Sequence, residues 1–117
     1  MADDNTRSSD NPGVKLPGIV GEIAREHPEL WSAYQQLGRA ASGAGPRDER
    51  TRRLVNLALA VGGDSEGAVH SHARRGLKEG LSAEELEQVA YLAVTTLGWP
   101  QAVRALTWIR DETRPDQ

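Results

Sequence analysis

The sequence predicts an all-α protein, a bundle of about six helices, and three observations support this prediction. Apolar residues recur at helical spacing in successive segments, and no segment alternates polar and apolar residues as a half-buried strand would. Clusters rich in glycine, serine or proline separate these segments at positions 42–45, 62–63 and 98–100. Ser82 and Glu85 have the spacing of a capping box, which marks the start of a helix.

The first 13 residues are polar and rich in turn-forming residues, so we expect a disordered tail, followed by one domain over residues 14–117. A short helix is predicted after Pro17, ending near Glu26. The next begins near Pro28, because proline is tolerated in the first helical turn. Its predicted buried stripe consists of Leu30, Trp31, Tyr34, Leu37 and Ala41.

A third helix is predicted from Pro46 to the glycine pair at positions 62–63, and its first turns are dense in charge. These turns are either solvated or face an anionic ligand or a partner subunit, because arginine binds carboxylates in a bidentate manner. The arginines concerned are Arg47, Arg50, Arg52 and Arg53. The apolar stripe that follows comprises Leu54, Leu57, Ala58 and Val61.

The segment 63–80 is the one around which the chain is organised. Asp64 or Ser65 is a candidate N-cap, and Gly80 is a good left-handed residue for the helix end. Its apolar face, spaced as one side of a helix, consists of Val69, His72, Ala73, Gly76 and Leu77.

The histidines of this segment occupy different faces. His72 lies within the apolar stripe and is either a core histidine or one that transfers a proton to or from a substrate; burial would keep it neutral near pH 7. His70 shares a charged face with Glu66 and Arg74. We therefore expect His72 to be largely buried and His70 to be more exposed. Glu66 and His70 alone supply too few ligands for a metal ion, so no metal site is predicted.

Two further helices complete the predicted bundle. The capping box opens a helix with the stripe Leu86, Val89, Ala90, Ala93 and Leu97. The final helix follows Pro100, directs Ala102, Ala105, Leu106 and Ile109 inward and carries Trp108 to one side. Residues 113–117 are expected to fray.

Composition limits the possible functions. The 117 residues carry a net charge of −3, which gives no electrostatic footprint for nucleic acid. The absence of cysteine excludes disulfides, thiolate catalysis and Cys-ligated zinc within this chain. There is no long apolar stretch, so no membrane association and a cytoplasmic location are expected. With 38% hydrophobic residues and no phenylalanine, the core is thin and association with other copies is expected.

Several ordered motifs resemble the carboxymuconolactone decarboxylase family, of the alkylhydroperoxidase D (AhpD)-like superfamily. They are the segment 66–72 ending in His72, Gly80, the helix start at 82–85 and the Gly-Trp-Pro-Gln-Ala sequence at 98–102. The resemblance implies an all-helical subunit built around a helical hairpin, which associates as trimers or hexamers.

The resemblance also implies which residues form a site. The redox branch of the superfamily has a Cys-x-x-Cys motif, a histidine and an upstream glutamate; here these positions are Ser65, Ala68, His72 and Arg53. Thiol-dependent peroxidase activity is therefore not expected. The decarboxylase branch lacks the cysteine pair and keeps the histidine.

Two functions remain open at this point. The first is a small cofactor-free lyase acting on a carboxylate-bearing small molecule, with His72 as acid or base. In it Arg50 and Arg53 bind the substrate carboxylate, across a subunit interface if the site is shared, and Trp99 walls the pocket. The second is a non-catalytic oligomeric binding or accessory protein on the same scaffold.

Overall fold

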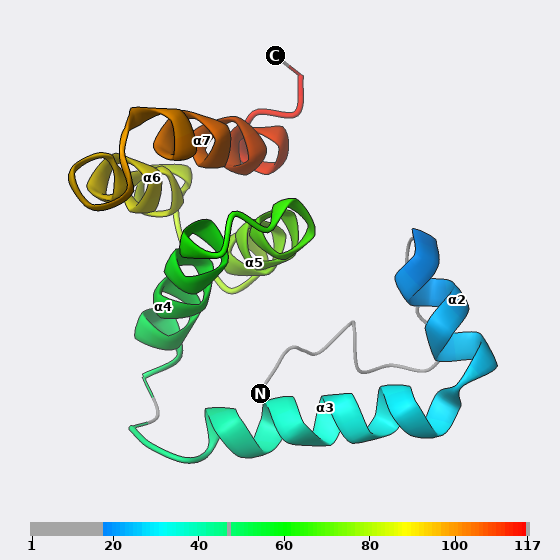
Figure 1. The fold of residues 1–117 in the computed structure, drawn as a ribbon. Coiled ribbons are helices and arrows are strands. Elements are labelled where there is room, and N and C mark those ends of the chain that lie inside the picture. Colours follow the sequence, from blue (N-terminus) through cyan, green and yellow to red (C-terminus); the bar gives the residue numbers. More distant parts are fainter. Residues whose placement is uncertain (1–17, 47, 117) are drawn as a thin grey trace. The chain divides into compact units, whose positions relative to one another are not determined.

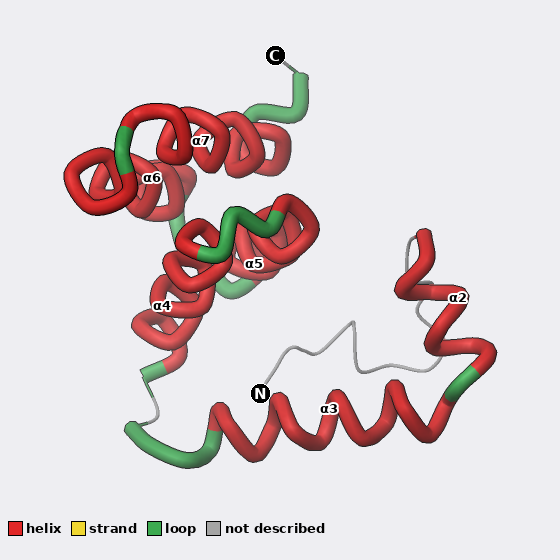
Figure 2. The backbone as a smooth tube through the Cα atoms, viewed as in Figure 1, coloured by secondary structure: helices red, strands yellow, loops and turns green. Residues whose placement is uncertain are grey.

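The computed structural model describes residues 18–46 and 48–116, and within them the chain forms six helices and no strand (Figure 2). The all-α prediction is therefore confirmed. The predicted N-terminal tail, residues 1–13, lies outside the described residues. The helices are α2 (Gly18–Glu26), α3 (Pro28–Ser42), α4 (Glu49–Gly62), α5 (Glu66–Lys78), α6 (Ala83–Leu97) and α7 (Trp99–Thr113).

The chain divides into two compact units, Met1–Arg47 and Asp48–Gln117. In the first unit α2 packs against α3, and the rings of Trp31 and Tyr34 stack with centroids 5.3 Å apart. The predicted buried stripe of α3 is wrong, because no residue of this helix is buried and, of the predicted stripe, only Trp31 is half-buried. Within this unit α2 alone does not cover the apolar face of α3, so Leu30, Tyr34, Leu37 and Ala41 are exposed.

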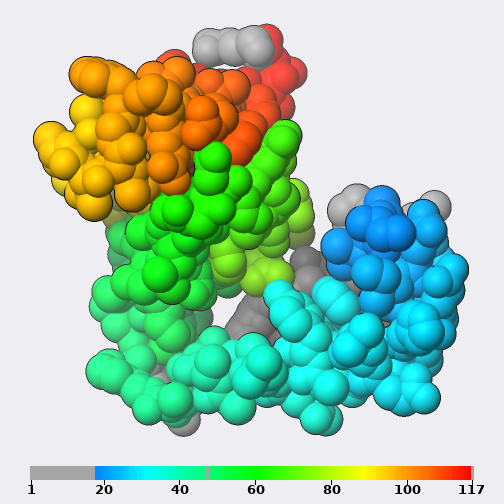
Figure 3. Space-filling model, viewed as in Figure 1, coloured from blue at the N-terminus to red at the C-terminus, as the bar shows by residue number. Residues whose placement is uncertain are grey.

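The second unit is a four-helix arrangement. α4 packs on α5 and α6, and α7 packs on the same two helices (Figure 1). The atoms of α6 and α7 form one continuous block in the space-filling view (Figure 3). The core is small and rich in alanine, as the composition predicts; it consists of Leu57, Ala60, Val61, Val69, Ala73, Leu81, Leu86, Ala90, Ala93, Ala102, Ala105 and Ile109.

The start of α4 differs from the prediction. Asp48 is the N-cap: its carboxylate accepts hydrogen bonds from the backbone N–H of Thr51 at 3.3 Å and from the Thr51 hydroxyl at 2.5 Å. The helix therefore begins at Glu49 and not at Pro46. Farther along, Ala60 is buried and Ala58 is exposed, so the predicted stripe was misplaced at that position.

Helix α5 has the predicted ends. Ser65 is its N-cap, while Asp64 adopts a φ of 53° and accepts hydrogen bonds from Arg104 instead. At the other end the N–H of Leu81 donates to the carbonyl of Gly76 at 2.9 Å, and Gly80 has a φ of 99°. This is a Schellman motif, which needs a left-handed residue at the position that Gly80 occupies.

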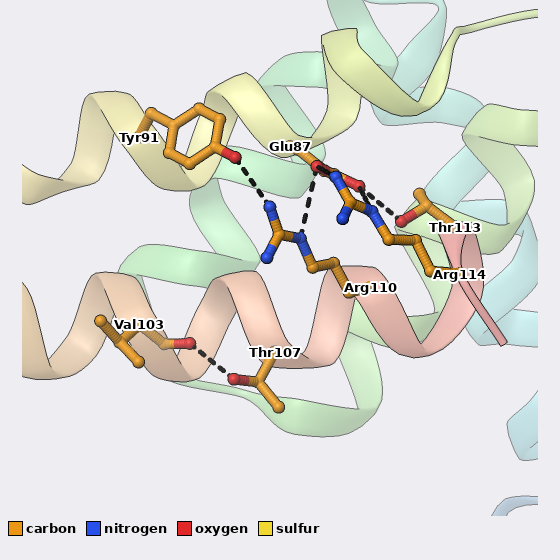
Figure 4. Close-up of polar contacts among 7 residues, drawn as sticks. All are labelled: Glu87, Tyr91, Val103, Thr107, Arg110, Thr113 and Arg114. Atoms are coloured by element: carbon orange, nitrogen blue, oxygen red, sulfur yellow. Dashed lines mark hydrogen bonds and ion pairs between the residues drawn. The ribbon is translucent and has the colours of Figure 1, made fainter. Parts of the chain in front are cut away.

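The capping box of α6 is confirmed, because the Ser82 and Glu85 side chains each bond the other residue's backbone. The expected fraying of residues 113–117 is wrong for Thr113 and Arg114. Both side chains donate hydrogen bonds to the buried carboxylate of Glu87 on α6, as Figure 4 shows. Across 18–46 and 48–116, no helix combines the length and apolar character that a bilayer crossing requires.

Candidate functional site

The candidate site is centred on Arg53, whose guanidinium is almost enclosed by protein. Arg53 lies one turn before Leu57 on the face of α4 that contacts α5 and α6, and its side chain is only 9% exposed. A buried guanidinium is costly unless carboxylates or other acceptors satisfy it. Of the two alternatives for the start of this helix, the solvated one holds for exposed Arg50 and not for buried Arg53.

Gly76 makes room for the aliphatic part of Arg53. A Cβ atom at Gly76 would lie 3.5 Å from Cγ of Arg53 and only 2.8 Å from Cδ2 of Leu86. Because glycine has no side chain, α5 approaches α4 and α6 closely at this point. The close approach brings the guanidinium of Arg53 to residues of α5 on either side of Gly76.

Glu79, at the end of α5, is the counter-charge of Arg53. Nε of Arg53 donates to one carboxylate oxygen at 2.9 Å, and Nη2 donates to the other at 2.8 Å. This is the bidentate geometry that matches a guanidinium to a carboxylate. The Glu79 side chain is 30% exposed, so the pair reaches from the interior to the surface.

His72 contacts the remaining nitrogen of the same guanidinium. Nη1 of Arg53 lies 2.6 Å from Nδ1 of His72. Arginine has only N–H donors, so Nδ1 of His72 is the acceptor of this hydrogen bond and carries no hydrogen. The neutral imidazole therefore has its hydrogen on Nε2. In this arrangement His72 presents a hydrogen-bond donor, and not a free lone pair, on its other side.

The surroundings keep His72 neutral. Burial lowers its pKa most, and the positive charges of Arg53 and then Arg75 lower it further, to about 4. At pH 7 the imidazole is consequently uncharged, as the sequence predicted from its apolar face.

The two histidines of α5 fall in the same range of exposure, because His72 and His70 are both half-buried. That His70 is the more exposed of the two stays a prediction. Nε2 of His70 lies 2.8 Å from a carboxylate oxygen of Asp111 on α7. Arg74, on the same face of α5, pairs with Glu112 at 3.6 Å. Two residues of the charged face of α5, His70 and Arg74, thus contact α7.

The other predicted site residues do not join this cluster. Arg50 is exposed and forms an ion pair with Glu85. Nη2 of Arg52 lies 3.9 Å from a carboxylate oxygen of Glu49 in the same helix. Arg47 lies outside the described residues. Trp99 begins α7 with 68% of its surface exposed. Roles for Arg50 and Trp99 in substrate binding stay predictions.

Two residues of the cluster were missed by the sequence reasoning. Glu79 lies seven residues after His72 and thus on the same helical face, which is the signal that could have identified it. Arg75 is three residues after His72 and acts on its charge state. Within the described part of the chain, no group of three or more acidic or histidine residues is placed to hold a metal ion.

The comparisons with known proteins show the family and agree with the all-helical fold. The carboxymuconolactone decarboxylase family model matches residues 28–111. The chain belongs to this family. A crystal structure of a carboxymuconolactone decarboxylase family protein from Legionella pneumophila is similar, with a TM-score of 0.67 and 28% identity over 81% of this chain and 88% of that one.

A second relative is an uncharacterized protein from Haemophilus influenzae, 40% identical over 53 residues. That match covers 45% of this chain and 47% of the relative, so this chain spans about half the length of that protein. The family match extends from α3 to α7 and hence includes parts of both units. A single domain over residues 14–117 stays a prediction.

The Arg53–His72 contact can be compared with the redox motif of the AhpD-like superfamily. By the spacing of the AhpD-like redox motif, Arg53 stands at the glutamate position and His72 at the histidine position. The structure places these two side chains in direct contact. Where the redox relatives are expected to have a carboxylate beside the histidine, this carboxymuconolactone decarboxylase family member has a guanidinium, with the carboxylate of Glu79 behind it.

Proposed function

We propose that this protein is a small, cofactor-free lyase that acts on a carboxylate-bearing small molecule, with His72 as a neutral hydrogen-bond donor to the substrate. The observation that carries the proposal is the 2.6 Å contact between Arg53 Nη1 and His72 Nδ1. This contact narrows the acid-or-base role expected from the sequence to a donor role. Nδ1 of His72 is occupied by Arg53, so the nitrogen left for a substrate is Nε2, which carries the hydrogen.

A neutral imidazole suits decarboxylation of a substrate that has a carbonyl as electron sink. The bond between the carboxylate carbon and its neighbour breaks, carbon dioxide leaves, and the electron pair moves onto the carbonyl oxygen as an enolate. A fixed N–H donor stabilises that developing oxyanion, and a neutral histidine can serve as such a donor. The enolate carbon then takes a proton from solvent or from an acid of the substrate complex.

The substrate carboxylate needs a cationic partner, and Arg53 retains capacity for it. A guanidinium has five N–H groups, of which the contacts to Glu79 and His72 use three. Arg50 is the second candidate, provided that it exchanges Glu85 for substrate. We further propose that the working form is a homo-oligomer, a trimer or hexamer as the family resemblance implies.

Turnover of carboxymuconolactone by the purified protein tests the reaction, and two substitutions at one position test the role of His72. Glutamine places an N–H donor near the position of Nε2, whereas alanine removes it. We expect His72→Ala to lose about 100-fold or more in kcat, the usual effect of removing an oxyanion donor, and His72→Gln to retain part of the rate. A folded wild-type protein without turnover would exclude this substrate; equal losses in both variants would exclude the donor role.

One observation favours the alternative, a non-catalytic binding or accessory protein. Each of the three guanidinium nitrogens of Arg53 already has a partner within the chain. A thermal-shift screen of small carboxylates with wild type and His72→Ala separates the two functions. A carboxylate that raises the melting temperature only when His72 is present, and is not turned over, would support the binding protein.

A further inference from the structure

We infer that Glu79 is a positioning residue that acts on His72 through Arg53: its carboxylate fixes the guanidinium so that Nη1 points at Nδ1 of His72, which holds the imidazole hydrogen on Nε2. This inference rests on the proposed donor role of His72. Its test, however, uses no enzymatic activity, so the two can fail separately.

The contacts of Glu79 determine the plane of the guanidinium. Two parallel hydrogen bonds, at 2.9 Å from Nε and 2.8 Å from Nη2, prevent rotation of the planar group about its long axis. The third nitrogen, Nη1, then has one direction available, toward His72 at 2.6 Å. A single hydrogen bond would leave the group free to turn, so both oxygens of Glu79 are needed.

The backbone on which Glu79 stands is fixed as well. Its N–H donates to the carbonyls of Arg75 and Gly76, and the Schellman motif with Gly80 follows directly. The aliphatic part of Arg53 lies against Gly76. The guanidinium and the imidazole are therefore carried by two closely packed helices, and the carboxylate by the hydrogen-bonded end of the second helix.

Burial explains why the guanidinium depends on Glu79. The side chain of Arg53 is 9% exposed, and removal of one partner from a buried ion pair leaves an uncompensated charge. Arg75 adds a second positive charge near His72 and therefore cannot offset the charge of Arg53. Without the carboxylate, the guanidinium gains by turning toward water, which withdraws Nη1 from His72.

The tautomer of His72 is measurable directly, because the chain has only three histidines, His27, His70 and His72. Long-range proton–nitrogen correlation spectra at pH 7 distinguish Nδ1–H from Nε2–H imidazoles, and His72→Gln identifies the signals of His72. We expect a single Nε2–H tautomer in the wild type. A wild-type His72 with hydrogen on Nδ1, or with a mixture of tautomers, would overturn the inference without any variant.

Glu79→Gln is the decisive variant, with Glu84→Gln as the matched control on the exposed start of α6. Glutamine keeps the shape of Glu79 but has one acceptor oxygen, so we expect the single-tautomer signature of His72 to be lost in Glu79→Gln and retained in Glu84→Gln. Arg53→Lys, which keeps the charge without the fork, should lose it too. An unchanged tautomer in folded Glu79→Gln would show that Glu79 does not position His72.

The wild type and Glu79→Gln also test a different role for Glu79. In that role its carboxylate only fills the place on Arg53 where a substrate carboxylate would bind, and does not position His72. Acetate serves as the probe. If Glu79→Gln binds acetate at Arg53 and thereby regains the Nε2–H tautomer, a carboxylate on the guanidinium is what positions His72, as inferred. If acetate binds the variant while the tautomer of His72 is the same with and without it, the inference is wrong.

Discussion

Nη1 of Arg53 on α4 and Nδ1 of His72 on α5 are 2.6 Å apart, and this contact decides the chemistry available to the histidine. A guanidinium neither accepts a hydrogen bond nor loses a proton in proteins. Protonation of His72 would add a hydrogen to Nδ1, so that two N–H groups would point at each other. The charged imidazole would also lie beside the charged guanidinium. The contact is compatible only with a neutral imidazole, in agreement with the lowered pKa.

The first prediction concerns stability as a function of pH. The pKa of His72 falls from its ordinary value of 6.5 to about 4 in the folded chain. Between these values the unfolded chain binds a proton that the folded chain does not, so the free energy of unfolding decreases as pH falls from 6.5 to 4. The loss has a ceiling of about 3.5 kcal/mol, at roughly 1.4 kcal/mol per pKa unit, and is smaller to the extent that solvent reaches half-buried His72.

Urea denaturation at pH 7 and pH 4 measures this effect. His72→Gln should remove it, so that the stability difference between wild type and variant shrinks as the solution is acidified. His27→Gln, at an exposed position before α3, is the control and should leave the pH dependence as in the wild type. A wild type and a His72→Gln variant that lose stability in parallel would contradict the burial of a neutral imidazole.

The second prediction concerns two glycines of α5. Gly76→Ala places a methyl group 2.8 Å from Cδ2 of Leu86 and 3.2 Å from Cδ1 of Leu81, and both leucines are buried. We expect a net destabilisation of about 1–3 kcal/mol, the usual cost of overpacking. Gly67→Ala, with no atom within 4 Å of the new methyl, should instead stabilise by about 0.5–1 kcal/mol through helix propensity. Equal stabilisation by both substitutions, in urea denaturation, would refute the close approach at Gly76.

Local signals explain which parts of the fold could be predicted from the sequence. The ends of α5 and α6 depend on residues within a few positions of each other, such as Ser82 with Glu85 and the left-handed Gly80. His72 was predicted as a site residue from its apolar neighbours and the family motifs. Its neutral state follows from the same apolar environment.

The remaining features depend on contacts between distant residues. The arginines of the segment 47–53 look equivalent in sequence, and what selects Arg53 is Gly76 and Glu79, more than 20 residues later. The stripe of α3 shows an apolar face but does not identify what covers it. In both cases the sequence shows which residue types are present, but it does not show which distant residues they contact.

The third prediction concerns Glu87, a carboxylate that protein atoms almost enclose: its side chain is only 4% exposed. It accepts hydrogen bonds from Thr113 at 2.8 Å and from Arg110 and Arg114, and Arg110 also donates to the Tyr91 hydroxyl, as in Figure 4. These bonds connect the second turn of α6 to the end of α7. They also keep the pKa of Glu87 below its usual value although burial alone raises it.

Glu87→Ala should cost about 1–3 kcal/mol, because partly exposed arginines can be rehydrated while the buried bonds are lost. Hydrogen exchange should increase first in the last turn of α7, where Thr113 and Arg114 lose their acceptor. Gln88→Ala, at the adjacent exposed position, should stay within about 0.5 kcal/mol of the wild type. Unchanged exchange at the end of α7 in Glu87→Ala would mean that this cluster does not hold the C-terminal turn.

The last prediction is that the protein is a homo-oligomer, a trimer or a multiple of it. Three large apolar side chains of α3 at helical spacing, Leu30, Tyr34 and Leu37, are 60%, 62% and 68% exposed. On α2, Ile19 is exposed to a similar degree, at 65%. Apolar faces of this extent in soluble proteins commonly mark interfaces, and the small alanine-rich core leaves the chain marginal by itself.

Sedimentation velocity at micromolar concentration should therefore give a mass that is a multiple of 12.7 kDa. Leu37→Glu introduces a charge into the apolar face of α3 and should shift the distribution toward smaller species. Gln36→Glu adds the same charge at the neighbouring exposed position and should leave the distribution unchanged, because adjacent residues point to different sides of a helix. A folded wild-type protein that sediments as a single 12.7 kDa species would show that the apolar face of α3 is not covered by another copy.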